Sequence, residues 1–297
     1  MRLRAWGIQT GFRMLLSMVA ALFAAIACFA PSTPWRPILI TPQLTPEATR
    51  AVMLDASTKR SVVLPFAHAS WSRDLASTFL GYENGVATRF SVGDTMKLTK
   101  GRVLTPTPDS WNQSRDLALS FNGSAMMLRS INGKQAPRRI QTGRGEIIAA
   151  EISPNGRWIA FTKKGSFRYH PGNDPYQDLW IVGTDNRNLR RLGHGSRPRW
   201  SPNSEGILAL EGSDDGRAVL VYVVKTGRYR KVLSADLEAF SGAAYSPDGL
   251  RIAILGSSSH PSHRMEVFLT DIKGRFLEVI LDSTHIPKNG YGWSIDW

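Results

Sequence analysis

Histidine is the residue type in this chain best suited to metal binding or to proton exchange near neutral pH, because its neutral and charged forms are close in energy. The chain contains six histidines: His68, His170, His194, His260, His263 and His285. The charged residues that could act with them are Asp174, Asp178, Asp282 and Arg197. His260 and His263 lack the i, i+4 spacing of a helical zinc motif. Two interpretations of these residues remain open: a site for a metal, an anion or a partner, or an ordinary polar surface. The sequence does not identify a metal.

Catalytic signatures are mostly absent from the sequence. It contains no G-x-S-x-G elbow, phosphate-binding loop, dinucleotide fingerprint or H-E-x-x-H pair. We therefore assign no catalytic residue and expect no cofactor, although the sequence does not decide whether the chain is an enzyme. The formal net charge of +13 favours anionic partners. No nucleic-acid recognition motif accompanies this charge, so nucleic acid is not an expected partner.

A repeated turn sequence indicates the elements that must position these residues. Residues 246–249 read Ser-Pro-Asp-Gly, residues 153–156 read Ser-Pro-Asn-Gly, and residues 201–203 are a looser copy. Each copy lies between an aromatic or β-branched residue and a run of apolar residues, which is the pattern of two antiparallel strands joined by a tight turn. The sequence therefore predicts a repeated strand–turn–strand unit.

An anchor residue before each turn sets the number of units. The six anchors are Trp71, Trp111, Ile152, Trp200, Tyr245 and Trp297, at spacings of 40, 41, 48, 45 and 52 residues. Each unit continues with two further strands and a Gly or Asn turn. Four antiparallel strands per unit of this length are typical of a propeller blade, so we expect an all-β, six-bladed β-propeller.

The two ends of the chain complete this interpretation. Residues 37–41, 51–55 and 60–64 offer three strands without a preceding anchor, while the C-terminus ends on an anchor without following strands. We expect the strand at 294–297 to complete the first blade and close the ring, which removes unpaired sheet edges between blades. The predicted division is residues 1–30 as a signal peptide or membrane anchor, 31–37 as a tether and 38–297 as the propeller.

The chain resembles a known family at these positions. Its Ser-Pro-Asp/Asn-Gly turns, with the Leu-Trp-Ile-Val run at 179–182 and the Leu-Arg-Arg-Leu run at 189–192, resemble the six-bladed propeller of TolB and related WD-like repeats. The resemblance is strongest over residues 147–297. It implies a binding or scaffolding module. TolB also carries an N-terminal α/β domain, for which we expect no room here, so its particular partners are not carried over.

The first 30 residues differ in kind from the rest. Arg2, Arg4 and Arg13 precede an uncharged run at 14–30, the pattern of an export signal or a short anchor. Cys28, the single cysteine, follows small residues as in a bacterial lipoprotein signal. Lipidation at Cys28, an uncleaved anchor, and cleavage with release remain open. We expect a membrane-anchored protein on the periplasmic or extracellular side.

Blade topology sorts the connections between strands onto two faces. Turns between first and second and between third and fourth strands share one face, here the tight-turn face; the other connections share the opposite, long-loop face. The long-loop face is predicted to carry all six histidines and the insertions at 98–109, 162–177, 193–197, 256–263 and 282–290. Basic pairs are predicted at the starts of fourth strands: Lys59-Arg60, Arg138-Arg139, Arg190-Arg191 and Arg230-Lys231. They either attract anionic lipid or envelope polymer, or protect strand edges.

The sequence predicts a membrane-tethered propeller outside the cytoplasm that binds or scaffolds a protein partner in or at the membrane through its long-loop face. Arg197, His170, His194, His260 and His285 are the first residues to test. The alternative is a metal-dependent propeller lyase or hydrolase that acts on an anionic polysaccharide and uses the same histidines as ligands. The identity of the partner, the envelope type and the oligomeric state are not specified by the sequence.

Overall fold

The computed structural model divides the chain into two units, residues 1–33 and 34–297. It describes residues 36–42, 50–66, 68–74, 77–83, 85–93, 95–164, 177–211, 218–232, 237–258, 265–281 and 293–297. The predicted signal or anchor, the tether up to residue 35 and Cys28 lie outside the described residues. No helix in the described part of the chain has the length and hydrophobicity of a membrane span.

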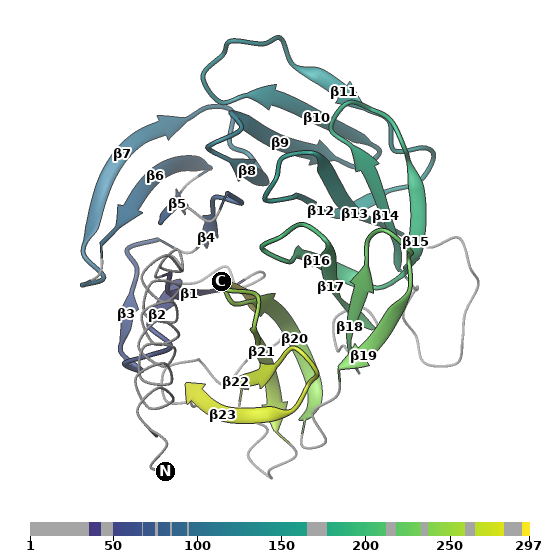
Figure 1. Ribbon diagram of the computed structural model, residues 1–297. Helices are drawn as coiled ribbons and strands as arrows, with labels where there is room; N and C mark the ends of the chain where they lie inside the picture. Colours follow the sequence, from purple (N-terminus) through teal and green to yellow (C-terminus); the bar gives the residue numbers. More distant parts are fainter. Residues whose placement is uncertain are drawn as a thin grey trace, which may run out of the picture. The chain divides into compact units, whose positions relative to one another are not determined.

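Six four-stranded antiparallel sheets, which we call blades 1 to 6, follow one another around a ring within residues 36–297 (Figure 1). Blade 1 has the order β24 (Trp293–Asp296), β1 (Ile38–Pro42), β2 (Val52–Leu54) and β3 (Ser61–Val63). Blade 2 contains β4 (His68–Trp71), β5 (Thr78–Glu83), β6 (Val86–Val92) and β7 (Leu98–Leu104). Blade 3 contains β8 (Ser110–Asn112), β9 (Leu117–Asn122), β10 (Ala125–Ser130) and β11 (Arg138–Ile140).

The remaining three blades are built in the same way from consecutive strands. Blade 4 contains β12 (Ile147–Ile152), β13 (Trp158–Lys164), β14 (Gln177–Gly183) and β15 (Arg190–His194). Blade 5 contains β16 (Ser196–Trp200), β17 (Gly206–Glu211), β18 (Ala218–Val223) and β19 (Tyr229–Val232). Blade 6 contains β20 (Leu237–Tyr245), β21 (Arg251–Ser258), β22 (Met265–Asp271) and β23 (Phe276–Leu281). The prediction of an all-β propeller with six blades is confirmed.

The anchor residues lie in or next to the innermost strand of each blade. Trp71 and Trp200 end β4 and β16, and Trp111 lies at the centre of β8. Their indoles pack between blades, where Trp71 and Trp111 have no exposed surface. The Trp111 indole N–H donates to Ser70 O at 3.1 Å, and the Trp200 indole N–H donates to Glu151 O at 3.1 Å. Each of these two anchors therefore ties its own blade to the preceding blade.

The serine of the repeated turn explains why the turn sequence recurs. Ser153 Oγ accepts a hydrogen bond from the N–H of Trp158 at 3.0 Å, and Ser246 Oγ accepts one from the N–H of Arg251 at 2.9 Å. The glycine that ends the turn has a positive φ, +69° at Gly156, where a residue with a Cβ is strained. The serine hydroxyl and the glycine together fix the turn between the first and second strands.

Blade 1 takes strands from distant parts of the sequence. β24 pairs with β1 in antiparallel register from Leu39 opposite Asp296 to Pro42 opposite Trp293. The hydroxyls of Thr41 and Ser294 lie 2.6 Å apart across this pair. The indole N–H of Trp297 donates to Arg36 O at 2.8 Å. Two segments more than 250 residues apart in sequence thus form one sheet.

Two predicted long-loop insertions are wrong. Residues 98–109 begin with a strand, because Leu98–Leu104 is β7, the outermost strand of blade 2. An outermost strand packs few side chains, so β7 lacks the alternation of apolar residues that identifies a strand. Residues 193–197 join β15 directly to β16 through Gly195 alone. The other predicted insertions lie mainly outside the described residues.

Candidate functional site

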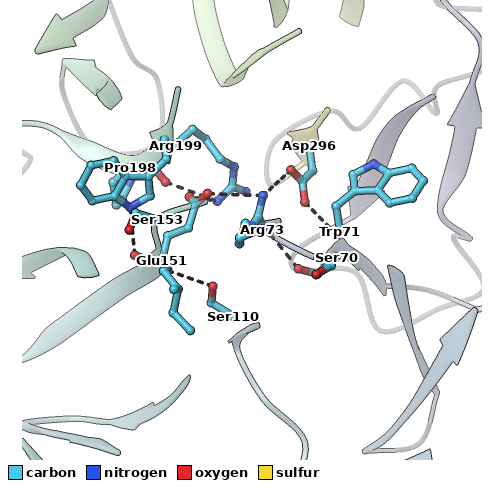
Figure 2. Close-up of polar contacts among 12 residues, drawn as sticks. Ser70, Trp71, Arg73, Ser110, Glu151, Ser153, Pro198, Arg199 and Asp296 are labelled. Carbon is cyan, nitrogen blue, oxygen red and sulfur yellow. Dashed lines mark hydrogen bonds and ion pairs between the residues drawn. The ribbon is translucent and has the colours of Figure 1, made fainter. Parts of the chain in front are cut away.

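The residue that immediately precedes each anchor points to the candidate site. These residues are Ser70, Ser110, Glu151, Arg199, Ala244 and Asp296, of which only Ala244 is apolar. Glu151 in blade 4 contacts Arg73, which follows the innermost strand of blade 2. Arg199 in blade 5 contacts Glu151 and the backbone of Ile295 in blade 1. Blades 2 and 4 are not neighbours in the ring, and neither are blades 5 and 1, so the Arg73 and Arg199 side chains reach their partners across its centre (Figure 2).

Four charged side chains form what we call the axial ion cluster: Arg73, Glu151, Arg199 and Asp296 (Figure 2). The Arg73 guanidinium lies 2.6 Å from Asp296 Oδ1 and 3.3 Å from Glu151 Oε1. Arg199 reaches the other oxygen of Glu151 at 3.2 Å. Asp296 Oδ2 accepts the backbone N–H of Trp71 at 3.1 Å. Every member except Arg199 has a side chain less than 10% exposed.

Each charge in the cluster favours the ionised form of its partners and so opposes the effect of burial. Burial alone raises the pKa of Asp296, but the nearby Arg73, Arg199 and Arg36 outweigh this effect and hold the pKa below its usual range. Burial also works against charge on Arg73, and the carboxylates of Asp296 and Glu151 raise its pKa above the ordinary value. Arg73 and Asp296 are therefore both charged at neutral pH.

Arg36 lies beside the cluster, but burial lowers its pKa, whereas the pKa of Arg73 is raised. Its guanidinium is buried, stacks 4.4 Å from the centre of the Trp71 ring, and donates to Ser72 O at 3.1 Å. Burial lowers the pKa of Arg36 to about 9, with Asp296 acting in the opposite direction. No carboxylate of the described residues forms an ion pair with Arg36, and burial has the largest effect on its pKa.

A cavity of ≈ 310 Å³, which we call the axial cavity, lies above the cluster. Arg73, Arg199 and Asp296 form its floor. The walls include Thr41 and Ser294, and the rim includes His68, Thr107 and Asp109. His68 starts β4, while Thr107 and Asp109 lie in the connection from β7 to β8, so the rim belongs to the long-loop face.

The rim side chains are hydrogen-bonding groups whose ionisation is affected by burial. The Tyr82 hydroxyl donates to Pro108 O at 2.9 Å, and burial raises the pKa of Tyr82. Burial also raises the pKa of Asp109, an effect that the N–H of Phe121 and the Arg129 guanidinium partly oppose. Desolvation lowers the pKa of His68, which favours its neutral form. The cavity thus has hydrogen-bonding side chains at its rim, above a floor of paired charges.

The predicted site residues have different outcomes. His68 lies on the rim of the axial cavity. Asp178 in β14 lies opposite His194 in β15 in the strand register, and neither residue lines that cavity. The Asp178 carboxylate lies 2.7 Å from the Arg191 guanidinium, and His194 Nε2 lies 3.6 Å from the Glu211 carboxylate. Arg197 donates to Ser241 O. The predicted residues outside the described part of the chain are His170, Asp174, His260, His263, Asp282 and His285.

Sequence reasoning missed the axial ion cluster, although the sequence contained a signal for most of it. A polar or charged residue precedes five of the six anchors, at a position where a central strand is normally apolar. Arg73 had no such signal, because it lies in a turn whose direction only the fold determines. Among the described residues, no group of three His, Cys, Asp or Glu side chains could hold a metal ion.

Comparisons with known proteins identify the fold. No protein-family model and no curated protein sequence matches the chain. A chain in the crystal structure of a nidogen/laminin complex matches with a TM-score of 0.58 and 10% identity, over 88% of this chain and 97% of that chain. TolB from Acinetobacter baumannii matches with a TM-score of 0.57 and 16% identity, over 88% of this chain and 67% of that chain. At these identities the matches establish the fold alone.

Proposed function

From the premise that the chain has a TolB-like six-bladed propeller fold, we propose that it is an extracytoplasmic, membrane-tethered module that binds or scaffolds a protein partner through its long-loop face. The observation that carries this proposal is the axial cavity, which has its rim on that face and charged residues at its floor. A chain of similar fold occurs in a nidogen/laminin complex, which supports a role of this architecture in protein assembly.

The construction of the cavity favours recognition of a polar segment of a partner. Its lining residues come from strands and connections of several blades, so they are held in place before a partner arrives, and little conformational entropy is lost on binding. The floor charges of Arg73 and Asp296 already neutralise each other. Specificity therefore rests on hydrogen bonds with Thr41, Ser294 and His68 at the walls and rim.

Membrane tethering and ring closure belong to the same proposal. The basic residues before the uncharged run at 14–30 support export with the propeller on the far side of the membrane. The antiparallel register of β24 with β1 supports closure of the ring by the C-terminal strand. A closed ring gives the binding face a fixed shape, as a scaffold needs.

Site-specific photo-crosslinking in membranes tests the proposed binding face. A photoreactive residue at His68 or Thr107, on the cavity rim, is expected to capture the same discrete protein partner. The matched control carries the photoreactive residue at Lys134 in the turn between β10 and β11, on the tight-turn face. A partner captured from Lys134 and not from either rim position would contradict the proposal.

A further inference from the structure

The described chain enters the ring on the tight-turn face. Arg36 precedes β1 and is held by Ser72 O, by the Trp71 ring and by the indole N–H of Trp297. Ser72 and Trp297 directly follow the innermost strands β4 and β24, at the ends of these strands that lie on the tight-turn face. Two contacts of its guanidinium and one of its backbone carbonyl therefore hold Arg36 beside that face.

Exposed basic side chains occupy the tight turns of every blade. The turns between third and fourth strands contain Lys59, Arg60, Lys97, Lys134, Arg187, Lys225, Arg228, Lys273 and Arg275, all exposed. Two turns between first and second strands add exposed Arg115 and Arg157. Hydrogen bonds between turns of neighbouring blades, such as Ser114 N–H to Asp74 at 2.6 Å, join the turns into one surface.

The acidic residues of the same turns are largely engaged in forming them. Asp55 accepts hydrogen bonds from Ser57 and Thr58, Asp116 from the N–H of Asn132, and Asp271 from the N–H groups of Lys273 and Arg275. Asp55 is buried and Asp116 and Asp271 are half-buried, whereas the basic side chains of these turns are exposed. Exposed acids of the described turns are Asp185 and Glu205. The outward charge of this face is therefore predominantly positive.

Blade 6 adds exposed apolar side chains to the same face. Leu250, in the turn between β20 and β21, is 64% exposed, and Ile272 and Phe276 around the turn between β22 and β23 are 38% and 50% exposed. Contacts between β20 and β24 make blade 6 the neighbour of blade 1, which the chain enters at Arg36. Apolar side chains among lysines and arginines are typical of surfaces that lie at a lipid interface.

We propose that the tight-turn face docks on an anionic phospholipid surface, so that the axial cavity points away from the membrane. This inference rests on the proposed membrane tether. With the proposed tether ending at residue 30, the six residues up to Arg36 can span at most about 20 Å, so the tether would keep Arg36 near the membrane surface. Each lysine or arginine near an anionic surface increases partitioning about fivefold.

Lysine footprinting of the full chain tests the orientation. The chain is mixed with vesicles of phosphatidylcholine alone or with added phosphatidylglycerol, and the acylation of each lysine is followed by mass spectrometry. Lys97, Lys134, Lys225 and Lys273 report on the tight-turn face. Lys164, exposed at the end of β13 on the long-loop face, is the internal control.

The expected result is slower acylation of the four tight-turn lysines with phosphatidylglycerol vesicles, no change at Lys164, and loss of the effect at high salt. Protection of Lys164 instead, or equal acylation of all lysines on vesicles that carry the protein, would overturn the orientation while leaving the tether intact. Protection on phosphatidylglycerol vesicles without any binding to phosphatidylcholine would keep the docking face and refute the tether.

A pair of triple variants provides a matched control for net charge. Lys134→Glu, Lys225→Glu and Lys273→Glu together reverse three cations on the tight-turn face, and Arg50→Glu, Arg144→Glu and Lys164→Glu reverse three exposed cations on the long-loop face. The first variant is expected to lose the protection of Lys97 on phosphatidylglycerol vesicles, and the second to keep it. Equal behaviour of the two variants would show that total charge, not this face, governs binding.

Discussion

The Arg73 guanidinium lies 2.6 Å from the Asp296 carboxylate, although 223 residues separate them in the sequence. Arg73 also reaches Glu151, so one side chain from blade 2 links blades 1 and 4 across the centre of the ring. The contact forms only when the first and last parts of the described chain are both in place. The stability of the ring and the floor of the axial cavity thus depend on the same pair.

Removal of the Asp296 charge is expected to destabilise the protein strongly. In Asp296→Asn, Arg73 keeps Glu151 but loses its shortest ionic contact while it stays buried, which costs about 3–5 kcal/mol of unfolding free energy for a broken buried pair. The matched control is Glu278→Gln, which breaks the exposed pair with Lys59 and costs less than about 1 kcal/mol. Urea unfolding measures both. Equal losses in the two variants would contradict the structural role of the cluster.

Acid is expected to weaken the protein through the same carboxylate. The pKa of Asp296 is lower in the folded state than in the unfolded chain, so the folded state is favoured while the group is ionised, and this contribution is lost as pH falls below about 4. Unfolding free energy measured against pH should therefore decrease on acidification. Asp296→Asn should show a shallower decrease over the same range. An unchanged acid slope in this variant would assign the acid sensitivity to other carboxylates.

Deletion of residues 293–297 is expected to abolish cooperative unfolding. The deletion removes β24 and exposes the edge of β1, along with the Asp296 side of the axial ion cluster. The milder Trp297→Phe keeps β24 but removes the indole hydrogen bond to Arg36 O and one ring of a buried side chain, which costs about 1–3 kcal/mol. Far-ultraviolet circular dichroism during thermal unfolding distinguishes the two. A sharp, native-like transition in the deletion variant would refute ring closure by the C-terminal strand.

Elemental analysis of the purified full chain separates a binding module from the alternative enzyme. A binding module is expected to contain no stoichiometric metal. The metal-dependent lyase or hydrolase would contain metal that is lost when predicted ligands are replaced, as in His194→Ala and His263→Ala. Retention of a stoichiometric metal in the native chain and its loss in these variants would favour the enzyme acting on an anionic polysaccharide.

Much of the fold could be predicted because the turn chemistry repeats. A serine that bonds to the second strand and a glycine with positive φ impose the same sequence at Ser153 and Ser246. The buried anchors impose a large apolar residue, aromatic in five of the six units, at regular intervals. The outermost strand β7 obeys no such constraint, since little of it is buried, and it was mistaken for a loop. Strands could be predicted where a turn or a buried anchor restricts the residue types, and could not be predicted where most side chains are exposed.

The candidate site could be predicted only in part for the same reason. The position of His68 at the long-loop end of blade 2 could be predicted, because topology alone assigns the first residue of an inner strand to one end of the blade. The contact between Arg73 and Glu151 depends on the curvature of the whole ring, which no local sequence pattern encodes. Ionic contacts across an axis are a property of the assembled sheets.

The composition of blade 1 has a consequence for the timing of folding. Its strand β24 is the last described strand to be synthesised, whereas its partner β1 is the first. During translation β1 therefore remains without this partner, and blades 2 to 6 can gather their strands before it does. A nascent or prematurely terminated chain that lacks β24 would expose the unpaired edge of β1 to chaperones and proteases. The cell could therefore recognise an incomplete molecule by the absence of this one strand.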